Sequence, residues 1–568
     1  MKFQILDIKI RYKTTDSLRT FIRLFGRTIS GESVCCDVYG APFYFYTTHW
    51  RDHYVQSINQ HFSKAYGKCR CPNCAGWKTG RNEPCKDVQR AYLDETILKT
   101  ETVYGKSFVG YCEDQNPFTK VYVSHPFLIR PITWHLESKL EQEMILPEWF
   151  ETDVPPAIRF CTDFNINPAG WVEVGGTVVD DDEVRVLHHV SVDLELDQTI
   201  IPNEFAGNCP LSIMYTDIEC ISMVDRFPQA KCKCSNNLQH SNNSCYNHQA
   251  FQFLNCNYRK VCPVLLLFCD YDQHVKMELM VSWFAGGDPI IQIACVAAKH
   301  GIEGHTTTLF TLGSCSPIDG ATVVCSSTET ELLNRLRLYI IENDFDIISG
   351  YNSDAFDLPY IFERAEQLKI KNFPDFSRER GFPSFFKKSV FQSAQAGTIE
   401  SIHWTIPGII PFDLLPLCRK TFKLGSYKLN NVAKAKLNDQ KEDLDYKLLR
   451  PLQQGTADDR KRIGTYCIQD TVLVKKLTDK LQLLVNNIEV AKVIGITLFE
   501  VLTRGQTHKV KTKLLQTTSK RNIFLPTFPR DKATGHIQCF WHNYVVNKKQ
   551  QEAAGGKAKF KGATVSFY

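Results

Sequence analysis

Residues 213–220 constrain this chain most strongly, because an apolar run there carries two acids near its end. The run predicts a short buried strand, and successive side chains of a strand point to opposite faces. Asp217 and Glu219 then share one face. Ile213 and Tyr215 lie on the same face as the two acids. Met214, Ile218 and Cys220 lie on the opposite, apolar face.

Two carboxylates side by side on a buried strand repel each other and lose hydration. A divalent cation would relieve both costs, because Mg²⁺ and Mn²⁺ prefer oxygen ligands. The alternative is a strand end whose acids simply reach solvent. Asp217 and Glu219 alone do not decide between these readings, so the choice depends on acids elsewhere in the chain.

The length of 568 residues predicts three or four domains. The net charge of +5 is small, so any basic surface must be local. The first 20 residues lack the apolar core of a secretory signal, and the longest apolar run, residues 261–269, is shorter than a membrane span. We therefore expect a chain that is not secreted, has no membrane partner and keeps its 22 cysteines reduced.

Two cysteine-rich segments interrupt the chain. The first, within residues 66–90, holds a set that permits a structural zinc but does not match a standard spacing: Cys69, Cys71, Cys74 and Cys85. The second lies within an insertion at about residues 229–286, whose Cys and His content also permits a metal without specifying one. A solvated polar loop is the alternative in both places.

The remaining sequence predicts a β-rich amino-terminal part followed by a mixed α/β sheet. Residues 1–60 read as short strands and turns with an aromatic core. The later expected elements are strands at 104–111, 118–123, 289–296 and 345–352, and helices at 132–143, 328–343, 357–369, 455–482 and 498–515. The last helix is basic, with Arg504 and Lys509 among its cations, and is either a phosphate contact or a solvated face.

Two more acids stand at chemically useful places. Asp357 begins the helix expected just past a strand end, where its carboxylate could also serve only as a helix cap. Tyr466 and Asp470 are four residues apart in a helix and so share a face, although such a pair also arises by chance. Together the four acids could hold two divalent ions for phosphoryl chemistry, with the tyrosine hydroxyl orienting a water.

These motifs resemble those of family B DNA polymerases. Residues 215–219 (YTDIE), 350–357 (GYNSDAFD) and 466–470 (YCIQD) are similar to the three exonuclease motifs of that family. Flanking segments resemble its delta-type and herpesvirus-type branch: residues 289–294 (PIIQIA), 424–430 (LGSYKLN) and 503–506 (TRGQ). The resemblance covers nearly the whole chain apart from the cysteine-rich segments and the apolar run.

The resemblance implies a ribonuclease H-like 3′→5′ proofreading exonuclease that uses two Mg²⁺ or Mn²⁺ ions. Carried over by motif, the metal ligands would be Asp217, Glu219, Asp357 and Asp470, and Tyr466 would position the water. Asn352 and Phe356 would shape the site around a frayed primer end, while Arg504, Lys561 and Gly562 would contact DNA. The expected domains are 1–205 (template framing), 206–480 (exonuclease) and 481–568 (connection and start of a palm).

Polymerase palm motifs are absent, and residues 560–565 (FKGATV) resemble the short segment that precedes a palm. We expect the front part of a replicative polymerase that binds primer–template DNA, single-stranded 3′ ends and a processivity factor. The expected location is the nucleus, or the host nucleus if the source is viral, and otherwise the cytoplasm. A standalone exonuclease and a non-enzymatic DNA-binding scaffold are the alternatives.

Overall fold

The computed structural model describes residues 1–13, 19–64, 96–108, 114–142, 148–179, 190–195, 200–203, 205, 207–222, 228–230, 287–393, 397–438 and 444–527. The chain divides into two compact units made of separate stretches. Unit 1 comprises Met1–Arg11, Phe21–Ala41 and Asp163–Thr512; unit 2 comprises Tyr12–Thr20, Pro42–Thr162 and Lys513–Tyr568. The domain boundaries expected near residues 205 and 480 divide the chain into consecutive segments, whereas each unit is made of separate stretches. These boundaries remain predictions.

A mixed sheet forms the centre of the later part of unit 1. In the described chain it has six strands in the order β15-β14-β13-β12-β16-β19. Their bounds are β12 Ser212–Cys220, β13 Ile290–Lys299, β14 Thr306–Leu312, β15 Ala321–Ser326, β16 Ile347–Gly350 and β19 Ile410–Asp413. The strand β12 runs antiparallel to β13 and parallel to β16, so it is buried between two neighbours.

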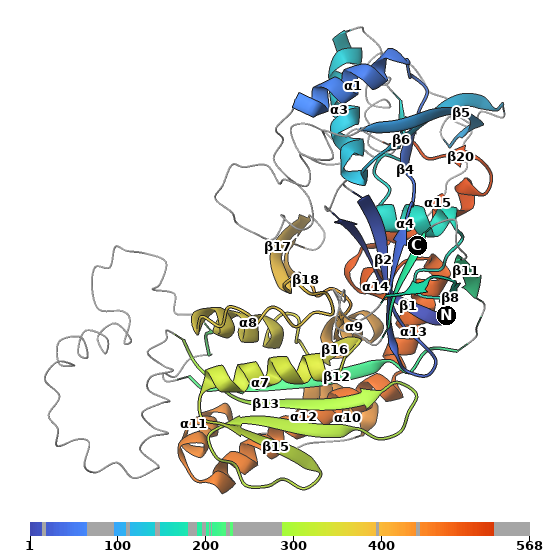
Figure 1. Cartoon of the computed structure of the whole chain (residues 1–568). Helices are drawn as coiled ribbons and strands as arrows, with labels where there is room; N and C mark the ends of the chain where they lie inside the picture. Colours follow the sequence, from blue (N-terminus) through green and yellow to red (C-terminus); the bar gives the residue numbers. More distant parts are fainter. Residues whose placement is uncertain are drawn as a thin grey trace, which may run out of the picture. The chain divides into compact units, whose positions relative to one another are not determined.

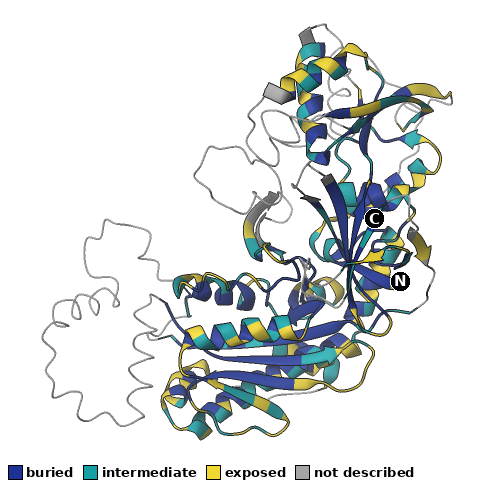
Figure 2. Ribbon diagram, in the orientation of Figure 1, coloured by how far each residue is buried: buried dark blue, intermediate teal, exposed yellow. Residues whose placement is uncertain are grey.

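Helices cover both faces of this sheet (Figure 1). The helices α7 (Glu329–Glu342) and α8 (Asp357–Gln367) pack on one face through side chains such as Leu333 and Leu358. The opposite face is covered by α9 Leu414–Thr421, α10 Leu429–Leu437, α12 Ala457–Lys480 and α13 Leu483–Ile494. Figure 2 shows the strands β12 and β13 almost wholly buried between these layers.

Capping side chains explain why these helices start where they do. Thr328 accepts a hydrogen bond from the Glu331 N–H at the start of α7. Thr456 and Asp459 form a reciprocal capping box at the start of α12.

The other described elements of this region are the hairpin β17 Phe385–Ser393 and β18 Gly397–Thr405, and the helices α11 Tyr446–Gln454, α14 Leu498–Thr503 and α15 Gln506–Ser519.

A second sheet in unit 1 has seven described strands in the order β11-β8-β1-β2-β3-β10-β9. Their bounds are β1 Lys2–Lys13, β2 Arg19–Arg27, β3 Ser33–Tyr39, β8 Trp171–Val174, β9 Thr177–Val178, β10 Val190–Glu195 and β11 Ile200–Asn203. A buried ionic network connects this seven-stranded sheet to the loop before β17. Arg23 binds Asp37 at 2.6 Å and Glu379 at 2.9 Å, and Arg11 binds the same Glu379 at 2.6 Å.

Unit 2 holds a smaller sheet, with five described strands in the order β20-β5-β6-β4-β7. Its elements are β4 Phe43–Thr47, β5 Ile97–Ser107, β6 Asn116–Val123, β7 Trp149–Phe150, β20 Ile523–Phe524, α1 His53–Lys64, η1 Pro126–Leu128, α3 Ile129–Gln142 and α4 Pro156–Asp163. Its core is aromatic, as expected from the sequence: Tyr44, Tyr46, Phe118, Phe150 and Phe524.

Most expected elements of the α/β region are confirmed within a few residues, and two expectations are wrong. Residues 53–64 form the helix α1 rather than strands and turns, because Tyr54, Ile58 and Phe62 recur at helical spacing and are buried. The basic helix expected at 498–515 is two helices, α14 and α15, which the extended backbone of Arg504 separates.

Several expectations fall outside the described residues. They concern Cys69, Cys71, Cys74, Cys85, most of the 229–286 insertion, Lys561, Gly562 and the expected start of a palm. None of the helices in the described part of the chain combines the length and apolar character needed to cross a membrane.

Candidate functional site

The two acids of β12 lie near the carboxyl end of that strand and are half-buried. Asp217 is opposite Ala294 of β13, and Glu219 is opposite Gln292. The pairing register shifts immediately after Glu219, an irregularity of the kind that β-bulges produce and that often re-aims side chains beside active sites. The strand therefore presents both carboxylates on one face, two residues apart.

The remaining side chains of β12 divide between the faces as the alternation predicts. Met214, Ile218 and Cys220 join the core beneath α7 and α8. Ile213 and Tyr215 join the core beneath α9, α10, α12 and α13. Asp217 and Glu219 consequently belong to the side of the sheet that α12 covers.

Asp357 reaches β12 from the other covering layer. It is the first residue of α8, and only 3% of its surface is exposed. Its Oδ1 accepts a hydrogen bond of 3.2 Å from the peptide N–H of Ile218, the residue between the two acids of β12. The paired residues of β12 and β16 end at Tyr215 and Ser349, so Asp357 satisfies a buried peptide N–H beyond that pairing.

Burial is the main reason that the pKa of Asp357 is raised to about 7, and the nearby Asp413 carboxylate contributes to the rise. A carboxylate in this position is costly unless a cation compensates it. Asp357 is thus a buried acid held against β12 in an environment that favours neutralisation or metal binding.

The helix α12 also brings side chains to the end of β12, because it packs against β12 and β13. Its Asp470 is buried, Tyr466 one turn earlier is half-buried, and Cys467 between them is fully buried. Gly464 lets this helix lie close to the sheet, because an added Cβ there would come within 2.4 Å of Leu309. The helix therefore delivers Tyr466 and Asp470 to the side of the sheet that carries Asp217 and Glu219.

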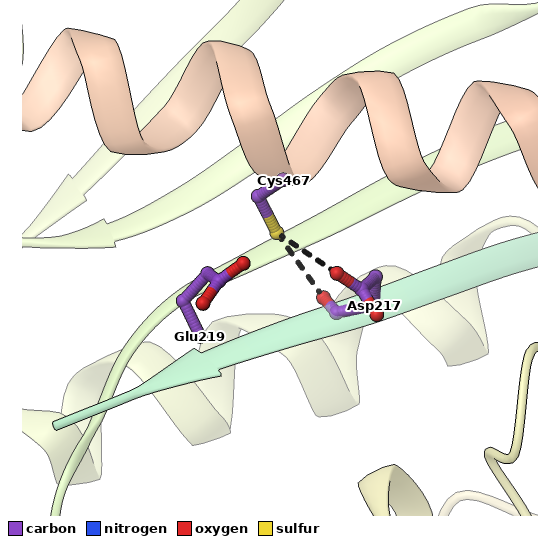
Figure 3. Close-up of side chains that lie close together, drawn as sticks. All are labelled: Asp217, Glu219 and Cys467. Carbon is purple, nitrogen blue, oxygen red and sulfur yellow. Dashed lines mark hydrogen bonds between the residues drawn. The ribbon is translucent and has the colours of Figure 1, made fainter. Parts of the chain in front are cut away.

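The thiol of Cys467 connects α12 to Asp217 of β12. Its Sγ contacts the backbone O of Asp217 at 3.5 Å and Oδ2 of the same residue at 3.8 Å (Figure 3). Burial, followed by the charges of Asp217 and Glu219, raises the pKa of Cys467 well above its usual value, and Asp470 adds to the effect. The thiol therefore stays protonated and donates to Asp217.

One group of ligand atoms in the described part of the chain lies within 4.8 Å of one another, and it consists of Asp217, Glu219 and Cys467. The group does not include Asp357 or Asp470. The hard oxygen donors suit Mg²⁺ or Mn²⁺ rather than a soft ion, because the thiol is held protonated. The half-buried Asp217 and Glu219 and the buried Asp357 are acids whose negative charge a divalent cation would compensate. The donor set therefore fits such a cation.

Asn352 and Phe356 flank Asp357 in the turn between β16 and α8. Asn352 is half-buried and has a left-handed backbone with φ of 66°, and its carbonyl accepts from the Phe356 N–H at 2.9 Å. Phe356 packs partly on the core beneath α8, with its ring centroid 5.5 Å from that of Tyr360. Both residues are therefore placed within one short turn of the buried acid.

The basic residues expected to contact DNA are only partly available. Arg504 is exposed at the end of α14. Lys509 is buried instead, and its Nζ donates to the carbonyl of Val501 at 3.0 Å. His508 contacts Glu500 at 3.2 Å, so both residues join α15 to α14 rather than presenting a free basic face.

Two residues near the acids were not singled out from the sequence. Cys467 lies inside the motif of Tyr466 and Asp470, and its burial follows from the helical periodicity of α12. Asp413 ends β19, where an acid after a short apolar run is the same signal that marked Asp357 beyond its strand. It accepts hydrogen bonds from the turn that contains Asn352.

Comparisons with known proteins show what the chain is similar to. The family model "DNA polymerase family B, exonuclease domain" matches residues 148–253 and 269–432. The DNA polymerase delta catalytic subunit of Drosophila melanogaster is 28% identical over 528 residues, covering 89% of this chain and 42% of that protein. The subunit of the same name from Dictyostelium discoideum is 30% identical, covering 92% of this chain and 42% of that protein.

A family B DNA polymerase of the archaeon Pyrobaculum calidifontis has a similar fold. The TM-score is 0.58 at 17% sequence identity, covering 94% of this chain and 52% of that one. The chain spans about 42% of the length of the delta subunits it matches. These relatives come from an animal and a slime mould, so the viral source and the cytoplasmic location among the expectations have no support from them.

The acids on β12, α8 and α12, the family model and the similarity along the chain lead to one assignment. The chain belongs to the family B DNA polymerases, whose exonuclease domain it carries and whose delta type it resembles.

Proposed function

We propose that this chain is the amino-terminal, exonuclease-bearing portion of a replicative DNA polymerase, and that its site removes nucleotides from the 3′ ends of DNA. The observation that carries the proposal is that elements bearing acids pack together at the end of β12. Asp217 and Glu219 come from the strand, Asp357 accepts from the Ile218 N–H between them, and Asp470 lies on the helix α12, whose Cys467 thiol contacts Asp217. The six-stranded order supports a ribonuclease H-like fold for this region.

In this proposal Asp217, Glu219, Asp357 and Asp470 hold two Mg²⁺ or Mn²⁺ ions. Such ions would activate an attacking water and stabilise the leaving oxygen of an in-line displacement. The Tyr466 hydroxyl, on the face of α12 that it shares with Asp470, orients the water. The thiol of Cys467 restrains the Asp217 carboxylate through its S–H contact.

The DNA end would enter beside the turn between β16 and α8. Phe356 offers an aromatic ring for stacking, which tolerates any base, and the Asn352 side chain can hydrogen-bond the terminal nucleotide. Arg504 at the end of α14 can contact the phosphate backbone. Primer–template DNA and single-stranded 3′ ends are thus the proposed substrates, with a processivity factor as partner and the nucleus as the location.

An exonuclease assay with the 568-residue chain tests this function. A 5′-labelled single-stranded oligonucleotide with Mg²⁺ or Mn²⁺ should shorten progressively from its 3′ end, and a chelator should stop the reaction. Asp217→Ala and Asp357→Ala should abolish shortening. Asp458→Ala is the matched control, because Asp458 is an exposed acid in the first turn of the helix that carries Asp470.

The label position makes the direction visible, because removal from the 5′ end would release the label in the first step. Full activity of the Asp217→Ala and Asp357→Ala variants would refute the site assignment. Loss of activity in all variants including Asp458→Ala would point to general damage rather than to these acids.

A further inference from the structure

Asp413 occupies a junction between two strands and a helix. It is the last residue of β19 and the N-cap of α9, where its side chain accepts a hydrogen bond of 2.9 Å from the Leu415 N–H. Only 6% of its surface is exposed. The cap bond alone accounts for one of its carboxylate oxygens at the start of an ordinary helix.

The same carboxylate also binds the neighbouring turn. Gly350 of β16 pairs in parallel with Asp413, so the chain leaving β16 passes directly beside it. The Asn352 N–H donates to Oδ1 of Asp413 at 2.8 Å, and the Asp354 N–H donates to Oδ2 at 3.3 Å. One side chain therefore receives three peptide N–H groups from two segments that are about sixty residues apart.

The turn begins at Asn352, whose backbone is left-handed with φ of 66°. Asn adopts this conformation more readily than most residues, and the bond from its N–H to Asp413 fixes where the turn starts. From there the turn closes on itself, since the Asn352 carbonyl accepts from Phe356 N–H at 2.9 Å and the Ser353 carbonyl accepts from Leu358 N–H at 3.0 Å. The turn leads to Asp357, whose Oδ1 accepts from the Ile218 N–H.

We propose that Asp413 is a positioning residue of the exonuclease site, which holds the turn from Asn352 to Asp357 so that the Asp357 carboxylate faces the acids of β12. The proposal rests on the proposed function for its catalytic consequence. Asp413 binds the peptide N–H groups of Asn352 and Asp354, so it acts through the turn. Its removal should weaken metal binding by misplacing Asp357 rather than by removing a ligand.

The test compares three variants of the full chain. Asp413→Ala removes both carboxylate oxygens and with them all three hydrogen bonds. Asp413→Asn keeps an amide oxygen that can accept from Leu415 and Asn352 but places an NH₂ group opposite the Asp354 N–H. Asp445→Ala is the matched control, because Asp445 caps α11 by accepting from Lys447 N–H at 3.0 Å and has no contact with the site turn.

The first measurement is Mn²⁺ binding by titration calorimetry, and the second is the Mn²⁺ concentration that gives half-maximal exonuclease rate. Supporting residues of metal sites change metal affinity by about 10–100-fold when lost. We expect a shift of that size for Asp413→Ala, a several-fold shift for Asp413→Asn and no shift for Asp445→Ala. A variant that is merely less stable would lose active fraction while its Mn²⁺ midpoint stays unchanged.

An Asp413→Ala midpoint equal to that of Asp445→Ala would overturn the proposal. If Asp413→Ala does not fold, as judged by thermal melting, Asp413→Asn decides, and an unshifted midpoint there overturns it. A wild-type chain that binds Mn²⁺ but degrades no DNA would refute the proposed function, while the calorimetric shift would still support Asp413 as a positioning residue. A wild-type chain that binds no Mn²⁺ would overturn both.

Discussion

Replacing Asp357 by Asn should stabilise the metal-free chain at the same time as it abolishes nuclease activity. Burial raises the pKa of the Asp357 carboxyl to about 7 in the folded chain, compared with about 3.9 in an unfolded one. Each pKa unit corresponds to about 1.4 kcal/mol, so ionising this buried group costs the folded state up to about 4 kcal/mol at high pH.

The sign follows from which state binds the proton more tightly. Because the folded pKa is the higher one, the stability linked to Asp357 is fully present below about pH 4 and is lost as the pH rises to about 7. The variant Asp357→Asn has no charge to bury, and its amide oxygen can still accept from Ile218 N–H. It should be more stable than the wild type at pH 8 and closely similar at pH 4.

Hydrogen exchange of the β12 amides measures this difference in one element of a large chain. With a chelator at pH 8, the slowest amides of Ser212–Cys220 should exchange more slowly in the variant, by up to about 10³-fold. Asp458→Asn gives the baseline for an exposed acid-to-amide change. Adding Mg²⁺ should slow exchange in the wild type more than in the variant, which keeps the other three proposed ligands.

Faster exchange in Asp357→Asn than in the wild type at pH 8 would refute the reasoning. So would a difference between the two chains that is the same at pH 4 and pH 8, because the effect would then not come from ionisation of Asp357.

Three further predictions concern other side chains. Arg364→Met should destabilise unit 1 by about 3–5 kcal/mol, because it leaves buried Glu329 without its ion pair at 2.5 Å. Adding Glu329→Gln to the same chain should recover part of that loss, and urea unfolding of both variants measures it. Cys467 should resist alkylation at pH 8 while exposed Cys325 reacts, as peptide mass mapping can show, and rapid labelling of Cys467 in the folded chain would contradict its buried, protonated state. Tyr466→Phe should lower the exonuclease rate by about 10²-fold or more with Mn²⁺ affinity unchanged, and an unaltered rate would exclude a role for the hydroxyl.

Local patterns were sufficient to predict the acidic strand and the helices around it. Period-two alternation in residues 213–220 correctly divided the side chains of β12 between two cores. The helix expected at 328–343 is α7 with its caps at Thr328 and Asn343. In these places the residue types that form an element also begin and end it, so sequence-local physics decides the structure.

The role of Asp413 could not be predicted in this way, because it depends on the parallel pairing of β16 with β19. Its partners Asn352 and Asp354 are distant in sequence and meet it only in the folded sheet. The break between α14 and α15 at Arg504 was missed, although Gly505 follows it and breaks helices readily.

The contact of Asp357 with β12 was likewise not predictable from spacing alone. Asp217 and Glu219 share a strand, whereas Asp357 binds that strand because the pairing of β12 with β16 ends at Tyr215 and leaves the Ile218 N–H for its carboxylate. The resemblance of the motifs predicted that these acids act together, and their joint role remains a prediction.

Anomalous diffraction from crystals of the chain grown with Mn²⁺ and a single-stranded oligonucleotide would test the central claim most directly. The account predicts two Mn²⁺ peaks beside the end of β12, coordinated by Asp217, Glu219, Asp357 and Asp470, with the 3′ end of the DNA between Phe356 and Tyr466. Absence of any peak there, or a single peak whose ligands exclude Asp357 and Asp470, would contradict it.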